Sequence, residues 1–401
     1  MDPQFRPAFN RAYTPELYRA FLQRLETALG PVPFRVAETP LFVTPALRTQ
    51  LARQAVEIVQ QLAEPAKLER LKRAIPAKYD TPGMDALPNC VQVDFAMTPG
   101  PDGTLEGKVV ELQAFPSGYA MMTFFADAWR ETFAQVPGLQ TNWSCFVDMT
   151  PEQGYDLMRR TIVGGEDPEH VALVDFEPEH QKTAVDFVAT QRLFGVETAC
   201  ATKLIKKGRS LFRESRGLLV PVRRIYNRMV FDELEVKGYA LPWDWRDDLD
   251  VTWASHPNWY WVWSKYSLPF LDHPAVPKAR FVSDLTHLPD DLSGFVLKPL
   301  FSFAGSGVVI DVTPEDIARI PEAQRGGWVL QDKITYASAI TAPGDVQIKA
   351  EVRVMLLRAP EDEALRPVIF LARMSRGKML GVDQNKGMTW VGGSVSIWPG
   401  L

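Results

Sequence analysis

The segment from residue 295 to residue 310 constrains the fold more than any other part of this 401-residue sequence. It reads as an apolar strand that carries Lys298, a loop that ends in Gly305, Ser306 and Gly307, and a second apolar strand. Paired glycines let a backbone come close to a ligand and present several N–H donors to one anion, and a lysine at a strand end adds a mobile positive charge. The segment therefore fits a polyphosphate. It fits equally well a simple hairpin whose turn needs glycine and whose lysine reaches solvent.

Composition and charge narrow the classes of partner. The sequence is 46% hydrophobic and 23% charged, with a net charge of -5, which argues against nucleic acid or an anionic membrane as the main partner. Cys90, Cys145 and Cys200 are far apart and have no metal-binding spacing, which indicates a reducing compartment. No signal peptide or membrane-spanning apolar run is recognisable. We therefore expect a cytoplasmic protein with no nucleic-acid and no membrane partner.

Residues 1–89 are predicted to form an N-terminal helical segment. Leu17, Phe21 and Leu25 recur at helix spacing. Thr44 followed by Pro45 is typical of a helix start, because threonine caps the first turn and proline fits its first position.

From residue 90 the apolar period changes to two, which indicates strands at residues 91–97 and 107–114. The turn residues between them predict a hairpin, with Asp94 and Glu111 on neighbouring strands. Glu111 and Gln113 are two apart and so share one strand face. Two carboxylates and an amide oxygen suit magnesium bound together with nucleotide phosphates. The competing interpretation is a surface hairpin whose acidic residues serve only solubility. We assign residues 90–165 to this strand pair.

Residues 166–262 are predicted to form a central α/β unit that ends in a tryptophan-rich connection. Strands at 171–175 and 196–200 flank a helix at 181–194, and this alternation implies a parallel sheet. Six of the eleven tryptophans crowd into the connection: Trp243, Trp245, Trp253, Trp259, Trp261 and Trp263. Such a cluster can stack on a sugar, but we favour an anchor that packs the connection onto the core.

Residues 263–401 contain a short helix at 263–271 and further predicted strands at 328–334, 349–357, 368–374 and 390–398. Glu351 and Arg353 share one strand face, which places a guanidinium where it can pair with a carboxylate or a phosphate. An ordinary cross-strand ion pair is the alternative.

The order of these motifs resembles the ATP-grasp superfamily, and specifically the circularly permuted branch that is similar to the synthetase domain of glutathionylspermidine synthase. The resemblance rests on Val93-Asp94-Phe95, Val110-Glu111-Leu112-Gln113-Ala114, Tyr226-Asn227-Arg228, Ser264-Lys265, Val296-Leu297-Lys298 with Gly305-Ser306-Gly307, and Val329 to Ile334. It implies a mixed α/β (α+β) fold of ATP-grasp type in permuted order, with a central parallel α/β unit and the helical segment at the N-terminus.

The resemblance also implies roles for the residues that match. Magnesium would be held by Asp94, Glu111 and Gln113. ATP would be bound by Lys265, Lys298, Gly305, Ser306, Gly307, Gln331, Lys333 and Ile334. Lys265 and Lys298 would contact the phosphates, and backbone groups between Gln331 and Ile334 would contact the adenine. Lys298 and Arg353 would be catalytic. The sequence departs from the family where Gln113 replaces an asparagine, and where Phe303 and Ala304 replace polar loop residues.

The activity implied is that of an ATP-dependent carboxylate–amine ligase. The γ-phosphoryl group would move to a small-molecule carboxylate, and an amine would attack the acyl phosphate, with release of ADP and phosphate. The alternative is a catalytically degenerate nucleotide-binding or scaffold protein on the same fold. A third reading, a carbohydrate-binding platform built on the tryptophan cluster, leaves Lys298 and the acidic strand pair unexplained.

Overall fold

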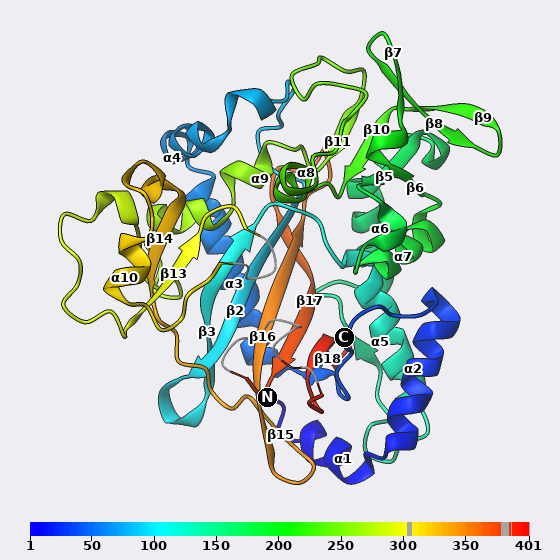
Figure 1. Ribbon diagram of the computed structural model, residues 1–401. Coiled ribbons are helices and arrows are strands. Elements are labelled where there is room, and N and C mark those ends of the chain that lie inside the picture. Colours follow the sequence, from blue (N-terminus) through cyan, green and yellow to red (C-terminus); the bar gives the residue numbers. More distant parts are fainter. Residues whose placement is uncertain (303–306, 378–384, 386, 401) are drawn as a thin grey trace.

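A mixed sheet runs through the middle of the molecule (Figure 1) in the computed structural model, which describes residues 1–302, 307–377, 385 and 387–400. Among these described residues the sheet has eight strands. The strand order is β1-β18-β17-β16-β2-β3, with β15 beside β16 and β4 beside β18. The bounds are β1 Leu41–Phe42, β2 Cys90–Pro99, β3 Leu105–Gln113, β4 Trp143–Ser144, β15 Ile340–Ala342, β16 Val346–Leu357, β17 Arg366–Ser375 and β18 Gly392–Pro399.

The predicted hairpin of β2 and β3 is confirmed. The strands pair antiparallel, and Asp94 lies opposite Glu111. β16 pairs antiparallel with β2 on one side and with β17 on the other. Strands from the first third and the last part of the chain therefore lie side by side.

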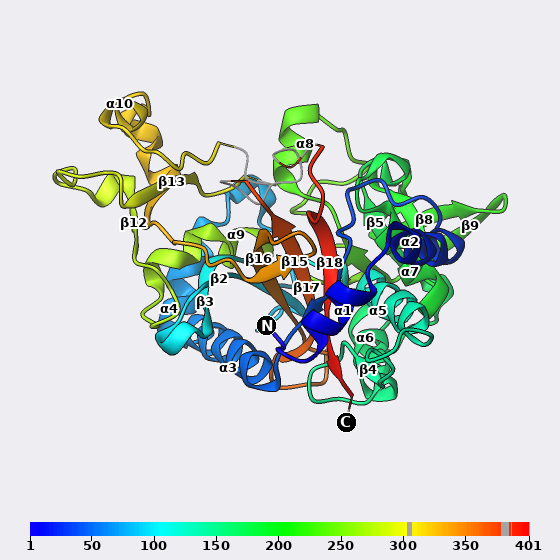
Figure 2. The same cartoon turned by 90° about the horizontal axis from the view of Figure 1, so that it is seen from below.

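One face of this sheet is covered by α3 (Pro45–Leu62), which contacts β3, β16 and β17. Figure 2 shows α3 lying along the sheet on the side away from β15. The hydroxyl of Thr44 accepts a hydrogen bond from the Leu47 N–H at 3.3 Å, so the predicted cap is confirmed. The approach of helix and sheet is close at Gly107, where an added Cβ would lie 2.4 Å from Cδ2 of Leu51.

The predicted N-terminal helices are α1 (Phe5–Ala12), α2 (Pro15–Leu29), α3 and α4 (Pro65–Leu71). They share a core with the rest of the chain. Phe21 of α2 stacks on Trp129 of α5 (Tyr119–Phe133), with ring centroids 3.8 Å apart. The short strand β1, which sequence periodicity does not indicate, pairs parallel with β18.

The predicted parallel sheet is also confirmed. Its order is β11-β10-β5-β6, and all three pairings are parallel. The bounds of the strands and of the adjacent helices are β5 Val171–Asp175, β6 Glu197–Cys200, β10 Arg224–Asn227, β11 Thr252–Ala254, α6 Pro151–Ile162, α7 Ala184–Phe194 and α8 Phe231–Lys237. A separate antiparallel ribbon projects from this unit (Figure 1) and consists of β7 (Ile205–Lys207), β8 (Ser210–Ser215) and β9 (Leu218–Val222).

The tryptophan-rich connection is part of the core. All six of its tryptophans are buried, with exposures of 8% or less. Trp261, on the short helix α9 (Trp259–Val262), stacks on Tyr79 with ring centroids 5.7 Å apart. Burial confirms the anchor interpretation and leaves no tryptophan platform on the surface of this connection.

A small antiparallel sheet lies beside β3, on the left in Figure 1. Its order is β12-β14-β13, with bounds β12 Ala279–Phe281, β13 Phe295–Pro299 and β14 Trp328–Asp332. The 3-10 helix η7 (Lys265–Phe270) contacts both β3 and β14, so it joins the small sheet to the central one. The prediction of a short helix in this region is confirmed.

The predicted second strand at residues 308–310 is wrong. Only Val309 aligns with β13, and its N–H and carbonyl exchange hydrogen bonds of 2.9 Å with Leu297. The chain then turns into α10 (Pro314–Ala318), whose first turn is capped by Thr313. Because the helix begins so soon, β13 has β14 as its full-length partner.

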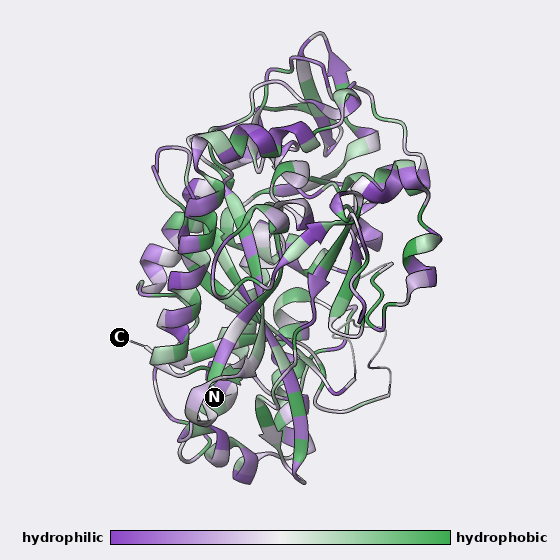
Figure 3. Cartoon of the chain, turned by 90° about the vertical axis from the view of Figure 1, so that its left-hand side faces the viewer, coloured by the Kyte–Doolittle hydropathy of each residue, from purple (hydrophilic) through white to green (hydrophobic). Residues whose placement is uncertain are grey.

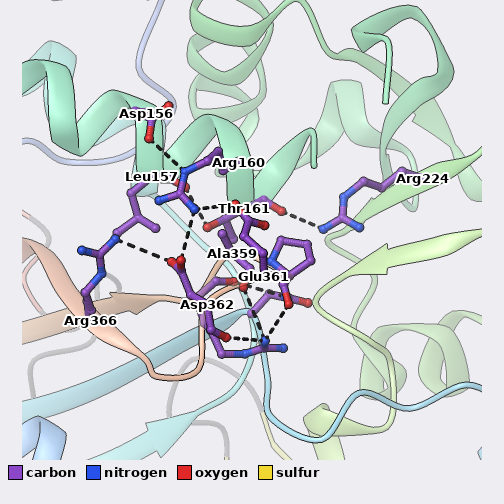
Figure 4. A network of polar contacts seen from close by, with 12 residues as sticks. Asp156, Leu157, Arg160, Thr161, Arg224, Ala359, Glu361, Asp362 and Arg366 are labelled. Atoms are coloured by element: carbon purple, nitrogen blue, oxygen red, sulfur yellow. Dashed lines mark hydrogen bonds and ion pairs between the residues drawn. The ribbon is translucent and has the colours of Figure 1, made fainter. Parts of the chain in front are cut away.

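Polar contacts tie the α/β unit to the turn between β16 and β17 (Figure 4). Arg160 of α6 lies 2.5 Å from Glu361 and 3.2 Å from Asp362. Arg224 of β10 donates to the Thr161 carbonyl at 2.8 Å, and Arg358 donates to the Leu87 carbonyl at 2.7 Å.

Elsewhere apolar residues gather in the inner strands (Figure 3). None of the helices in the described part of the chain has both the length and the hydropathy to cross a bilayer.

Candidate functional site

Charged side chains gather on the face of the central sheet that α3 does not cover. Phe95 lies beside Gly107 and Leu51, on the α3 side. Because successive side chains of a strand alternate between faces, Asp94 points to the other side. The register sets Asp94 opposite both Glu111 and Arg353.

The carboxylate of Asp94 is the centre of this face. Oδ1 accepts from Nε of Arg353 at 2.6 Å, and Oδ2 accepts from Nη2 of the same arginine at 2.8 Å. Nη2 of Arg373 also donates to Oδ2. Burial alone would raise the pKa of Asp94, which is 1% exposed, but the two guanidiniums outweigh burial and hold that pKa below its usual range.

Arg373 makes a second ion pair on the same face. Its Nη2 lies 3.2 Å from Oε2 of Glu351, the residue that it faces across β16 and β17. Oε1 of Glu351 accepts from the hydroxyl of Tyr336. Burial raises the pKa of Glu351, although Arg373 opposes this.

Lys298 reaches this face from β13 of the small sheet. Its Nζ donates to the Val110 carbonyl of β3 at 2.9 Å and to Oε1 of Gln331 at 2.7 Å. The side chain is only 7% exposed. Burial disfavours the charged form and lowers the pKa of Lys298 to about 8.

Lys265 approaches from the start of η7. Its Nζ donates to the Ser302 carbonyl at 2.7 Å and lies 3.5 Å from Oε2 of Glu111. Burial acts to raise the pKa of Glu111, but the ammonium of Lys265 and the more distant arginines bring it below its usual range. Both predicted phosphate lysines are therefore next to the acidic strand pair.

A pocket opens beside Lys265 and Glu111. The space in it that a water-sized sphere can enter is about 30 Å³. The polar lining comes from Glu111, Gln113, Ser264 and Lys265, and the aromatic lining from Phe115, Tyr260 and Phe301.

The predicted magnesium ligands do not form an open ligand set in this arrangement. Both oxygens of Asp94 are engaged by guanidiniums, and Glu111 faces Lys265. Nε2 of Gln113 donates to Oε1 of Gln92 at 2.7 Å. Within the described ranges, no group of three or more His, Cys, Asp or Glu residues could hold a metal ion. A dication next to Asp94 would meet two positive charges, so these residues do not fit the ion as they stand. Their role as ligands stays a prediction.

The remaining predicted nucleotide residues divide into two groups. Gln331 is 1% exposed, and its Nε2 has no hydrogen-bond partner in the part of the chain that the structure describes. Lys333 is exposed and its Nζ lies 3.1 Å from Asp311, and Ile334 is half-buried.

In the glycine loop, Gly307 is exposed and has a φ of +74°, a conformation that favours glycine. Gly305 and Ser306, together with Phe303 and Ala304, lie outside the described residues.

The charged cluster on this face consists of Asp94, Glu111, Lys265, Lys298, Tyr336, Glu351, Arg353 and Arg373. Two of its members, Arg373 and Tyr336, are not predicted from the sequence. Arg373 stands between the apolar residues Ala372 and Met374 of β17. A lone charge in such a strand is a signal of a buried partner. Identifying Glu351 as the partner needs the register of β16 and β17.

The fold and site together define a mixed α/β protein with a charged sheet face flanked by a smaller lysine-bearing sheet. No family model matches the sequence, and no curated protein matches it significantly. Among solved structures, it is similar to a glutathione synthetase-like effector, GSS30, from Globodera pallida in its apo form. The TM-score is 0.56 at 12% sequence identity, and the match covers 90% of this chain and 95% of the other. The chain thus shares the fold of a glutathione synthetase-like protein.

Proposed function

We propose that this protein binds ATP between the small sheet and the central sheet and uses it as a carboxylate–amine ligase of ATP-grasp type. The observation that carries the proposal is the convergence of Lys298 and Lys265, from two different elements, on the acidic face of β2 and β3. Two ammonium groups at one place suit a polyphosphate. The likeness in fold to a glutathione synthetase-like protein supports the same assignment.

The proposal includes the circularly permuted order of elements. The acidic strand pair β2–β3 precedes the lysine strand β13 in the chain, as it does in that branch of the superfamily. The adenine would lie beside β14, where the buried Nε2 of Gln331 is a donor without an acceptor among the described residues. An adenine ring nitrogen can supply that acceptor.

The reaction would run in two steps. A carboxylate oxygen of the substrate attacks the γ-phosphorus of ATP, the bond from that phosphorus to the oxygen of ADP breaks, and an acyl phosphate forms. The nitrogen of the amine then attacks the acyl carbon, phosphate leaves with the bonding electrons, and the nitrogen loses a proton to solvent. Lys298, Lys265 and Arg353 would neutralise the negative charge that moves during both steps.

A second candidate is a nucleotide-binding protein without ligase activity. The observation that favours it is the contact of both Asp94 oxygens with the guanidiniums of Arg353 and Arg373, which place two positive charges beside a carboxylate that a metal ion would need. Both candidates share the nucleotide site and differ only in turnover.

Calorimetric titration with ATP tests the shared part. We expect the wild-type protein to bind ATP and Lys298→Met to bind it at least about tenfold more weakly, because a buried charged contact to phosphate is lost. Lys203→Met is the matched control, since Lys203 is exposed on the α/β unit and far from the cluster in sequence. A Lys298→Met protein with undiminished ATP affinity would contradict the proposed site.

Turnover then separates the two candidates. ADP release is measured with a panel of carboxylates and amines, each alone and in pairs. Release that needs both partners supports the ligase, whereas ATP binding without release for any pair supports the second candidate.

A further inference from the structure

Arg373 occupies an unusual position between two carboxylates of the site. Its Nη2 contacts Oδ2 of Asp94 and lies 3.2 Å from Oε2 of Glu351. Asp94 belongs to β2, Glu351 to β16 and Arg373 to β17, three adjacent strands of the sheet. One positive group that bridges two carboxylates from neighbouring strands does what a divalent cation does in a carboxylate site.

The backbone fixes this arrangement. Arg373 is paired with Glu351 on one side and with Gly393 of β18 on the other, so its Cα is held within the sheet. The side chain of Arg373 is 30% exposed, while its Nε is buried and has no hydrogen-bond partner among the described residues. A buried N–H donor without an acceptor favours an added anion at this place.

The charges of the cluster favour an anion even without a metal ion. The basic side chains are Arg353, Arg373, Lys265 and Lys298, and the carboxylates are Asp94, Glu111 and Glu351. Asp94 and Glu351 are already neutralised by the arginines that they contact. Glu111 faces Lys265, so the four basic side chains exceed the three carboxylates by one positive charge.

We infer that Arg373, which bridges Asp94 and Glu351, is the built-in cation of this site, so that nucleotide phosphates are bound by arginine and lysine side chains without a metal ion. This inference rests on the proposed nucleotide site and specifies how that site neutralises phosphate. It also distinguishes this chain from a site in which acidic residues recruit Mg²⁺ with the nucleotide.

The first test compares ATP binding in excess Mg²⁺ with ATP binding in excess EDTA, by calorimetry on the full chain. We expect the two affinities to agree within about threefold, and Arg373→Gln to weaken binding in EDTA by about tenfold or more, since a charge-assisted contact is removed. Arg373→Lys keeps the charge and should recover part of the affinity. Arg366→Gln is the matched control, because Arg366 lies on the same strand, is 50% exposed and pairs with Asp362 away from the cluster.

The second test uses Mn²⁺ alone, followed by electron paramagnetic resonance. We expect no saturable Mn²⁺ site in the wild-type protein. Arg373→Gln should gain one, because Asp94 and Glu351 lose the cation that bridges them, and the double variant with Asp94→Asn should lose it again. Circular dichroism of each variant confirms that it is folded.

The outcomes separate the two proposals. ATP binding that requires Mg²⁺ would overturn the role of Arg373 and leave the nucleotide site standing. ATP binding in neither buffer would overturn the proposed function, and the Mn²⁺ titration would still decide whether Arg373 holds the place of a metal ion. A wild-type Mn²⁺ site that Asp94→Asn abolishes would overturn the inference directly.

Discussion

Lys298 is a buried ammonium group whose burial opposes folding at neutral pH. Its pKa is lowered from 10.5 to about 8 because burial disfavours the ammonium. Below about pH 8 Lys298 is protonated in both the folded and the unfolded chain. The full cost of burying its ammonium group, about 3 kcal/mol, then opposes folding. Between about pH 8 and 10.5 the unfolded chain binds more protons than the folded chain, so the free energy of unfolding rises with pH through this window.

We therefore expect Lys298→Met to be at least as stable as the wild-type protein at pH 7, and its relative stability to fall as pH rises from 8 to 10.5. Urea unfolding at several pH values measures this difference. Lys203→Met, at an exposed position, should show no such trend. Equal pH dependence of wild type and Lys298→Met would contradict the shifted pKa.

Asp94 is the opposite case, a buried charge that the fold needs. Removing its negative charge leaves Arg353 and Arg373 without their shared partner, and Asp94→Asn should lower the free energy of unfolding by about 3–5 kcal/mol. The lowered pKa of Asp94 means that the folded state holds its proton less tightly than the unfolded state. Its contribution is complete above the unfolded pKa of about 4 and is lost as pH falls through the lower folded value.

Chemical denaturation between pH 2 and 6 tests this effect. The wild-type protein should lose stability on acidification more steeply than Asp94→Asn. Asp248→Asn is a suitable comparison, since its exposed ion pair with Arg209 should contribute less than about 1 kcal/mol. Equal stability of the Asp94→Asn and Asp248→Asn proteins would show that the ion pairs of Asp94 with Arg353 and Arg373 contribute little to the free energy of unfolding.

At the scale of elements, the sequence predicts what is local. The hairpin of β2 and β3 is predictable because its turn residues and its period of two lie within one short segment, and the strand pairing confirms it. The parallel sheet follows from strand–helix–strand alternation. The wrong strand at residues 308–310 has the same apolar character as a real strand, but the capped start of α10 ends it after one bridge. Periodicity alone does not distinguish these cases.

The contact of α3 with the sheet gives a prediction for one glycine. A Cβ on Gly107 would lie 2.4 Å from Cδ2 of Leu51 and 2.9 Å from Cδ1 of Phe95. Gly107→Ala should therefore force helix and sheet apart and lower the free energy of unfolding by about 1–3 kcal/mol. Leu51→Ala destabilises by itself, but it makes room for the new methyl group. The double variant should consequently be more stable than the sum of the single effects predicts, which a double-mutant cycle in urea measures. Strict additivity would mean that the two residues do not crowd each other.

At the scale of the whole molecule, the site depends on strand pairings that connect distant parts of the chain. Residue type and spacing predict Asp94, Glu111, Lys298 and Arg353, and the resemblance to the ATP-grasp superfamily adds Lys265. The structure brings all five to one face. The sequence does not predict which of these side chains contact one another. Their contacts depend on which strands β16 pairs with and in which register, and only the structure shows that its partners are β2 and β17. The engagement of Asp94 by Arg353 and Arg373 comes from that register. The division into four domains stays a prediction, although β2 and β3 share a sheet with β16, β17 and β18.

The proposed nucleotide would connect the small sheet and the central sheet. Lys298 of the small sheet already donates to the Val110 carbonyl of the central sheet. A polyphosphate bound by Lys298 on one side and by Arg353 and Arg373 on the other adds contacts that are present only when both sheets are in place. Ligand binding stabilises the state that binds it, so local opening of either sheet should become rarer.

Hydrogen exchange followed by mass spectrometry can detect this coupling. ATP should slow exchange in β13 and β14 and in β2 and β16 over the same range of ATP concentration. The β7–β8–β9 ribbon, which belongs to a separate sheet, serves as the internal control and should not change. In Lys298→Met, the protection from exchange that ATP provides should be lost in both sheets together. The reason is that Lys298 is the residue of the small sheet that we expect to contact the phosphates. Protection confined to the small sheet would show that the nucleotide does not bridge the sheets, and the charged face of the central sheet would then need another ligand.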